Sequence, residues 1–217
     1  RSTLDRAAAA SDVYKRQAWY ENTCDGSDPL VLDLDGDGVE LLGLDSGVTF
    51  DVDADGALET TGWVGPDDGL LAMDLDGSGQ IEDMSEVFSE VFNGGNYTDS
   101  LAALATLDSN ADQVISAEDD QFDEILVWQD GDSDGVSTDA ELSTLTDHGI
   151  SAIDLDATAS NETVSGNTID AVGTVEFDDA TTGTFAEVTF VLDGAPTTFT
   201  LGGIISSGTE AVSYTHL

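Results

Sequence analysis

The sequence predicts an α+β fold in which EF-hand-like calcium loops, with short helices and strands, precede a small antiparallel β region. Three observations favour this prediction. Loops rich in Asp and Gly recur through residues 29–147, segments with helical spacing lie between them, and residues 150–205 alternate apolar with polar side chains. Apolar residues make up 40% of the 217 residues, which is enough to build a packed core.

The loops were compared with the 12-residue EF-hand template. That template takes side-chain oxygens from positions 1, 3 and 5, a carbonyl from position 7 and an acid from position 12, with Gly at position 6 for a sharp turn. The pattern D-x-D-x-D-G is expected about 0.08 times by chance in a chain of this composition, against the loop template. It occurs three times, so the sequence predicts calcium binding.

Two adjacent loops match the template best. "DGDSDGVSTDAE" (130–141) has every side-chain ligand, Gly135 at position 6 and Glu141 at position 12, and departs only at Ser137 in position 8. "DSNADQVISAED" (108–119) has Gln113 where the template has Gly, which we expect to strain the turn and weaken the site. With a helix between them, these loops are predicted to form an EF-hand-like pair.

Three further loops are variants. "DLDGSGQIEDMSE" (74–86) carries its acid, Glu86, one residue late. "DVDADGALE" (51–59) and "DLDGDGVE" (33–40) have the aspartate triplet and Gly but no acid at position 12. Over all five loops, the predicted metal ligands are Asp33, Asp35, Asp37, Asp51, Asp53, Asp55, Asp74, Asp76, Ser78, Glu86, Asp108, Asn110, Asp112, Asp119, Asp130, Asp132, Asp134, Val136 (through its carbonyl) and Glu141.

Helices are predicted where apolar residues follow a period near 3.6. Such spacing occurs in "DMSEVFSEVF" (83–92), "SLAALATL" (100–107) and "DDQFDEILVWQ" (119–129). Strands are predicted where apolar and polar residues alternate, in "TVEF" (174–177), "TFAEVTFVL" (184–192) and "TTFTL" (197–201). The second of these strands places one set of side chains on a single face, namely Ala186, Val188, Phe190 and Leu192. We expect these apolar stripes to form the core.

The two ends of the chain differ from its centre. Residues 1–17 and the last residues of the tail resemble translated adapter sequence. We therefore predict a non-native flank (1–17), a linker ending at an Asp-Pro bond (18–28), a calcium-loop region (29–147), a β-rich part of the same module (148–205) and a tail that is non-native at its end (206–217). Cys24 is the single cysteine of the sequence, so an internal disulfide is excluded.

The charge of the chain limits its partners. There are 46 acidic residues and four bases, and all four bases lie in the first 16 residues. Asp5 and Asp12 fall there too, which leaves 44 acids and no lysine or arginine beyond Arg16. Such a chain cannot bind nucleic-acid phosphates, and it repels itself unless cations neutralise it. We expect Ca2+ as a ligand, no membrane span, and an extracellular, secreted setting, which the charge suggests is salt-rich or halophilic.

The Asp28-Pro29 bond lies directly before the first loop. An aspartate carboxyl can attack its own main-chain carbonyl and close a five-membered anhydride, and the tertiary amide nitrogen of proline is readily protonated and expelled. Holding the carboxyl in the attack geometry raises its effective concentration. One Asp-Pro pair is common in chains of this composition, so the bond alone indicates no more than a turn.

The order of these motifs resembles a known family. "SDPLVLDLDGDGVELLGLDSGVTFDVDADG", "TGWVGPDDGLLAMDLDGSGQIEDMSEVF" and the segment from "LAALATLDSNADQ" to "GISAIDL" are similar to the calcium-dependent self-processing module of bacterial secreted RTX proteins of the iron-regulated type. The resemblance runs from about Asp28 to Phe190. It implies that calcium folds the module and that the Asp28-Pro29 bond is then cleaved. Asp28 would react as an anhydride, with water or with a lysine amine, and Pro29 would become the new N-terminus.

The hypothesis from sequence is thus a single-turnover, autocatalytic cleavage of Asp28-Pro29, with Asp28 and Pro29 as its catalytic pair. The module has no lysine of its own, so an amine acceptor would be a lysine-bearing partner protein. Two alternatives stay open. One is a passive calcium-stabilised spacer or adhesion module, and the other is an EF-hand or dockerin-like module that binds a partner.

Overall fold

The computed structural model describes residues 27–193. An eight-stranded sheet, antiparallel throughout, has the strand order β7-β10-β11-β12-β1-β6-β8-β9. Its strands are β1 (Leu30–Leu32), β6 (Gly69–Ala72), β7 (Val114–Ser116), β8 (Leu126–Trp128), β9 (Leu142–Thr144), β10 (Ile150–Val164), β11 (Asn167–Phe177) and β12 (Thr182–Thr189). Two small ladders pair β2 (Leu41–Leu42) with β5 (Trp63–Val64), and β3 (Thr49–Phe50) with β4 (Glu59–Thr60).

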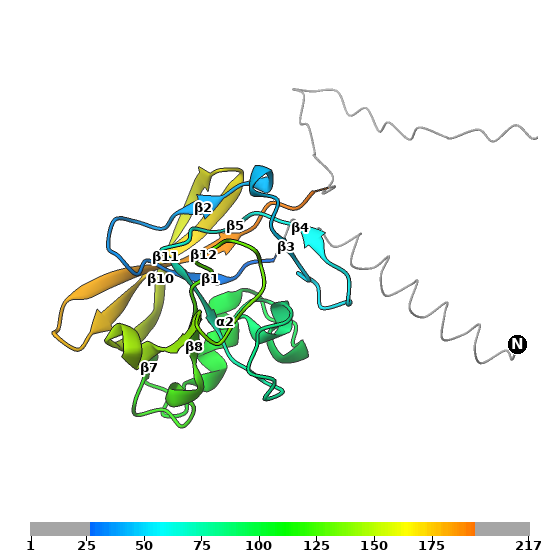
Figure 1. Ribbon diagram of the computed structural model, residues 1–217. Helices are drawn as coiled ribbons and strands as arrows, with labels where there is room; N and C mark the ends of the chain where they lie inside the picture. The colour runs from blue at the N-terminus through cyan, green and yellow to red at the C-terminus, as the bar shows by residue number, and fades with distance from the viewer. Residues whose placement is uncertain (1–26, 194–217) are drawn as a thin grey trace, which may run out of the picture.

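Helical structure is sparse between residues 27 and 193. It comprises the five-residue α-helix α2 (Ser100–Leu104) and six 3-10 turns. In Figure 1 the green segment with α2 lies beside the long strands β10 to β12, which run from yellow to orange. The turns are η1 (Leu44–Ser46), η2 (Met84–Glu86), η3 (Phe92–Gly94), η4 (Ala105–Leu107), η5 (Phe122–Glu124) and η6 (Leu145–His148).

The predicted α+β, EF-hand-like fold is therefore wrong. The described chain is mainly antiparallel sheet, and no EF-hand helices flank its loops. The helix predicted over 83–92 is two 3-10 turns separated by extended Val87, which pairs with Ala72. The helix predicted over 119–129 is η5 followed by β8. Only 100–107 is helical, as α2 and η4.

The reason lies in the residues that carry the helical spacing. Val and Phe at 87, 88, 91 and 92, and Ile and Trp at 125 and 128, are β-branched or aromatic and favour extended backbone. An amphipathic helix buries a single face, whereas β6 and β8 are covered on both sides of the sheet. Long-range pairing of these strands therefore replaces the predicted local helices.

The predicted strand at 174–177 is confirmed as part of β11, and the strand predicted at 184–192 is confirmed as far as Thr189, where β12 ends. Three residues of the predicted apolar face, Ala186, Val188 and Phe190, are fully buried. "LVL" (30–32) forms β1, between β12 and β6 near the centre of the sheet. The strand predicted at 197–201 lies outside the described residues.

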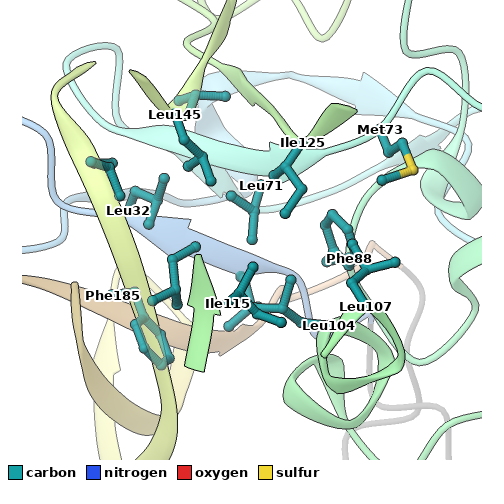
Figure 2. Packing of buried hydrophobic residues seen from close by; sticks show 14 of the residues in the cluster. Leu32, Leu71, Met73, Phe88, Leu104, Leu107, Ile115, Ile125, Leu145 and Phe185 are labelled. Carbon is teal, nitrogen blue, oxygen red and sulfur yellow. The ribbon is translucent and has the colours of Figure 1, made fainter. Parts of the chain in front are cut away.

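The core has two layers, one on each face of the sheet. Successive residues of a strand point to opposite faces, so Leu30 and Leu32 of β1 enter one layer while Val31 enters the other. Figure 2 shows side chains of the first layer, among them Leu32, Leu71, Leu104, Ile115 and Phe185. The second layer is built on a set of touching aromatic rings, namely Phe50, Trp63, Trp128 and Phe190.

The loop region and the β-rich region are joined through Asn167, a fully buried residue at the start of β11. Its Nδ2 donates to the carbonyl of Leu42 at 2.9 Å, and its Oδ1 accepts from the N–H of Val191 at 3.0 Å. Gly62 lies so close to this amide that a Cβ at position 62 would overlap it. Among residues 27–193, no helix combines the length and apolarity needed to cross a membrane.

Candidate metal loops and the Asp-Pro bond

The five acidic loops share one backbone conformation. In each loop, positions 4 and 6 take positive φ angles, a conformation that costs glycine little. The position-4 residues are Gly36, Ala54, Gly77, Ala111 and Ser133, and the position-6 residues are Gly38, Gly56, Gly79, Gln113 and Gly135. Gln113 has φ of 71°, so the predicted strain in its loop is confirmed. The aspartate patterns thus fold as equivalent loops without flanking EF-hand helices.

The first aspartate of each loop organises the turn. Asp74 is typical: its carboxylate accepts from the N–H groups of Gly77, Ser78 and Gly79 at 2.8–3.1 Å. Asp33, Asp51, Asp108 and Asp130 accept from their own loops in the same way. These first positions are buried or half-buried. The loop closes on itself, and its outer carboxylates at the next positions face solvent.

In four of the loops, the structure brings three carboxylates of the same loop together. Oxygens from each group lie within 4.8 Å of one another, a spacing that could hold a metal ion. The groups are Asp33, Asp35 and Asp37; Asp51, Asp53 and Glu59; Asp74, Asp76 and Glu86; and Asp130, Asp132 and Glu141. A fifth group, Asp35, Glu40 and Asp68, shares a residue with the first.

Several predicted ligands have other contacts within their loops. Asp55, Asp112 and Asp134 each accept the N–H two residues further on, at 2.8–3.0 Å. Ser78 Oγ accepts from Gln80 N–H at 3.1 Å, and Asn110 donates to Asp112 at 3.0 Å. The side chain of Val136, whose carbonyl was the predicted ligand, is exposed.

Glu86 joins its group although it comes one residue late in the template. Its two carboxylate oxygens accept from the N–H groups of Leu75 at 2.9 Å and Glu82 at 3.0 Å. Burial raises the pKa of Glu86 to about 7, hydrogen bonds from the backbone oppose this, and Glu82 adds to it. Glu86 is only 6% exposed, so a nearby cation must balance its negative charge or a proton must neutralise it.

Sequence reasoning missed three acids of these groups, Glu40, Glu59 and Asp68. Glu59 stands at position 9 of its loop, which the EF-hand template uses as a ligand position. Asp68 belongs to no loop, and its carboxylate accepts from the N–H groups of Leu34 at 3.2 Å and Glu40 at 2.7 Å. It is fully buried, and burial raises its pKa to about 6. No local pattern signals Asp68, because the loop it closes lies about thirty residues earlier in the chain.

The loop at 108–119 is different. Asp119, predicted as its acid at position 12, accepts from the N–H groups of Ser109 and Ser116 at 2.8 and 3.0 Å. Although burial opposes the shift, these hydrogen bonds lower the pKa of Asp119. The carboxylates of this loop are not brought into one group within the described residues. Asp119 therefore connects the beginning and the end of its loop by hydrogen bonds.

The donor set suits calcium. The groups consist of carboxylate oxygens, which a hard cation prefers. Residues 27–193 contain no lysine or arginine that could neutralise them. Glu40 Oε2 is shielded from solvent and has no hydrogen-bond partner there, although it belongs to the group with Asp35 and Asp68. Burial first, and then the charges of Asp37 and its neighbours, raise the pKa of Glu40 to about 7. A cation in this group would satisfy the orphaned oxygen.

The Asp28-Pro29 bond lies inside the fold, next to β12. The carbonyl of Ser27 accepts from Phe190 N–H and the carbonyl of Pro29 accepts from Val188 N–H, both at 3.0 Å. These bonds extend the ladder between β1 and β12 across the Asp-Pro bond. Proline has no N–H to donate in return, so on the β12 side the bond is held through the two carbonyls that flank it.

The Asp28 carboxyl is paired with a second carboxyl, that of Glu90. Glu90 N–H donates to Asp28 Oδ1 at 2.9 Å, and Asp28 N–H donates to Glu90 Oε2 at 3.2 Å. Burial, the hydrogen bond between the side chains and the charges of Glu90 and Glu187 raise the pKa of Asp28 to about 9, against a hydrogen bond from the Glu90 backbone. The Asp28 carboxyl therefore holds its proton more tightly than a solvent-exposed aspartate does.

Comparison with known proteins defines the class of this chain. The model of the SPM domain family matches residues 30–191, so the chain belongs to the SPM domain family. The match begins one residue after Pro29.

Among curated proteins the chain is similar to the iron-regulated protein FrpA of Neisseria meningitidis serogroup C. The two sequences are 39% identical over 178 residues, which is 79% of this chain and 16% of that protein. The chain thus spans about a sixth of the relative's length. This similarity agrees with the iron-regulated family indicated by the sequence motifs.

Proposed function

We propose that this SPM domain binds calcium through its acidic loops and, once folded by calcium, cleaves its own Asp28-Pro29 bond. The observation that carries the proposal is the Asp28 carboxyl, held by the N–H of Glu90 next to a peptide bond whose flanking carbonyls are bonded to β12 and the residue after it. We further propose that the module works outside the cell, where calcium is abundant, and that the parent protein is of the secreted RTX type.

Two segments link the proposed metal loops to the proposed cleavage site. β1 begins just after Pro29 and ends at Leu32, directly before Asp33, the first residue of a loop. The second segment begins at the loop acid Glu86 and reaches Glu90, the partner of Asp28, four residues later. Leu30 N–H donates to Phe88 O at 3.2 Å, which joins the two segments. Ordering the loops would therefore order both sides of the Asp-Pro bond.

Calcium, when bound, would supply the charge that lets the carboxylates of each loop stay together. The chemistry belongs to the chain. A carboxyl oxygen of Asp28 bonds to the main-chain carbonyl carbon of Asp28, and the bond from that carbon to the nitrogen of Pro29 breaks. The nitrogen takes a proton and leaves as a secondary amine. Water then opens the five-membered anhydride, or a lysine amine of a partner protein takes its place and forms an isopeptide bond.

The test is mass spectrometry of the chain incubated with millimolar calcium, with magnesium or with chelator. We expect two fragments, one that ends at Asp28 and one that begins at Pro29, and we expect them only in the sample with calcium. Their combined mass should exceed that of the intact chain by one water. Asp28→Ala should abolish the fragments and keep calcium-induced folding, measured by circular dichroism. Calcium-dependent folding without fragments in the unchanged chain would overturn the proposal and favour the passive spacer.

A further inference from the structure

We propose that Glu90 is the positioning residue for the Asp28 carboxyl, and that these two side chains share the proton that the departing nitrogen of Pro29 receives. The inference rests on the scission proposed above. It adds a role for a residue that lies outside the metal groups and 62 positions along the chain from Asp28.

The first support is the reciprocal geometry of the pair. Each residue donates its own backbone N–H to the carboxyl of the other, at 2.9 and 3.2 Å. Ser27 Oγ lies 3.5 Å from Glu90 Oε2 and adds a weak third contact. These bonds fix both the backbone and the side chain of Asp28. Such restraint is what an intramolecular attack requires, because free rotation of the carboxyl would lower its effective concentration.

The second support is the way the partner segment is anchored. Glu90 O accepts from Tyr97 N–H at 2.8 Å, and Phe88 O accepts from Leu30 N–H at 3.2 Å. The next pair of residues in these two segments is Asp28 and Glu90. There, Glu90 N–H donates to the side-chain carboxyl of Asp28 and not to its main-chain carbonyl. The Asp28 carboxyl thus accepts the N–H that the main-chain carbonyl of Asp28 would accept if the ladder continued.

The third support is the distribution of charge around the pair. The titratable groups that face Asp28 are Glu90 and Glu187, and neither is basic. Glu187, on β12, accepts from Ser100 Oγ at 2.8 Å and Leu101 N–H at 3.0 Å, so it is already engaged with the start of α2. Two adjacent carboxyls without a cation cannot both ionise readily, so the pair retains one proton.

This proton completes the scission. As the oxygen of Asp28 bonds to the carbonyl carbon, the carboxyl proton is released from the pair. The nitrogen of Pro29 gains a proton as its bond to that carbon breaks, so no proton is drawn from outside the pair. Glu90 leaves the reaction unchanged in composition, and water consumed by the anhydride restores the carboxyl of Asp28.

The test compares Glu90→Gln with a charge-matched control, Glu162→Gln, on an exposed part of β10. Glutamine can keep both hydrogen bonds to Asp28 but cannot share a proton. We expect Glu90→Gln to slow calcium-triggered scission at neutral pH by at least tenfold, while Glu162→Gln cleaves at the original rate. Calcium-induced folding, followed by circular dichroism, should be the same in both.

The pH profile separates a proton-sharing role from a structural one. The pKa of Asp28, about 9, places the loss of scission in the unchanged chain near that pH. Without Glu90's charge the pKa falls, so Glu90→Gln should lose scission at lower pH. Equal rates and equal profiles in the two variants would overturn the inference. A flat profile between pH 7 and 10 in the unchanged, folded chain would overturn it even if Glu90→Gln failed to fold. No scission in any chain would instead refute the proposed function.

Discussion

Two buried tryptophans offer a direct measure of how one metal loop is held to the core. Trp63 and Trp128 are both fully buried, with ring centroids 5.4 Å apart in the same aromatic layer. Trp63 Nε1 donates to Asp130 Oδ2 at 2.8 Å, and Asp130 is the buried first residue of the loop at 130–141. Trp128 Nε1 is buried without a hydrogen-bond partner in the described residues. Trp63→Phe and Trp128→Phe therefore remove similar amounts of buried ring, but only Trp63→Phe removes a hydrogen bond.

The expected difference follows from these contacts. Both substitutions lose packing of the same order. Trp63→Phe also loses a hydrogen bond to a charged acceptor, which contributes about 1.5–3 kcal/mol. Trp128→Phe instead removes an unsatisfied N–H, which offsets part of its packing cost by about 1 kcal/mol. Trp63→Phe should thus lower the free energy of unfolding by about 3 kcal/mol more than Trp128→Phe.

Urea unfolding in saturating calcium, followed by far-ultraviolet circular dichroism, measures this difference. With a denaturant slope of about 2 kcal/mol per molar urea, the two midpoints should lie about 1.5 M apart. Both substitutions should be made in the Asp28→Ala background so that scission does not intervene. Equal midpoints, or a lower midpoint for Trp128→Phe, would refute the reasoning and show that the bond to Asp130 contributes little.

Two other predictions concern the joint between regions and the metal groups. Gly62→Ala would place a Cβ against the buried amide of Asn167, so it should destabilise the fold by about 2 kcal/mol or more. Gly131→Ala, with open space at its Cβ, should change the melting temperature little. Similar melting temperatures for the two variants would contradict the predicted overlap. Glu86→Gln should weaken calcium binding at its loop by at least tenfold, about 1.4 kcal/mol, while Glu162→Gln, exposed and outside the metal groups, should not. Isothermal titration calorimetry measures both affinities, and matching values would exclude Glu86 as a ligand.

The sequence predicts the loops well because they are local. Asp at position 1 and Gly at position 6 lie five residues apart, and the turn between them is determined by hydrogen bonds such as Gly79 N–H to Asp74. Even the departure at Gln113 leads to the expected strained φ. Glu59 was also accessible to sequence reasoning, since it stands at a known ligand position of the template.

The sheet and the cleavage site were less predictable, for a common reason. The helical spacing at 119–129 is real, but β8 is buried on both faces by strands and loops from distant parts of the chain. Asp68 and Glu90 likewise contact partners that are 28 and 62 residues away in the sequence. A single sequence records which side chains are apolar or acidic, and long-range pairing decides which of them meet.

The position of β1 near the centre of the sheet has a consequence for what remains after scission. From Pro29 onward the strand stays bonded to β12 on one side and β6 on the other, with its side chains in both core layers. Ser27 and Asp28, in contrast, are held mainly by the bond to Phe190 and the pairing with Glu90. A cut at this bond would shed the upstream chain and leave a body that has lost almost none of its internal contacts. The reaction would then end in a folded remnant, and opening of the anhydride by water or an amine would make the cut permanent.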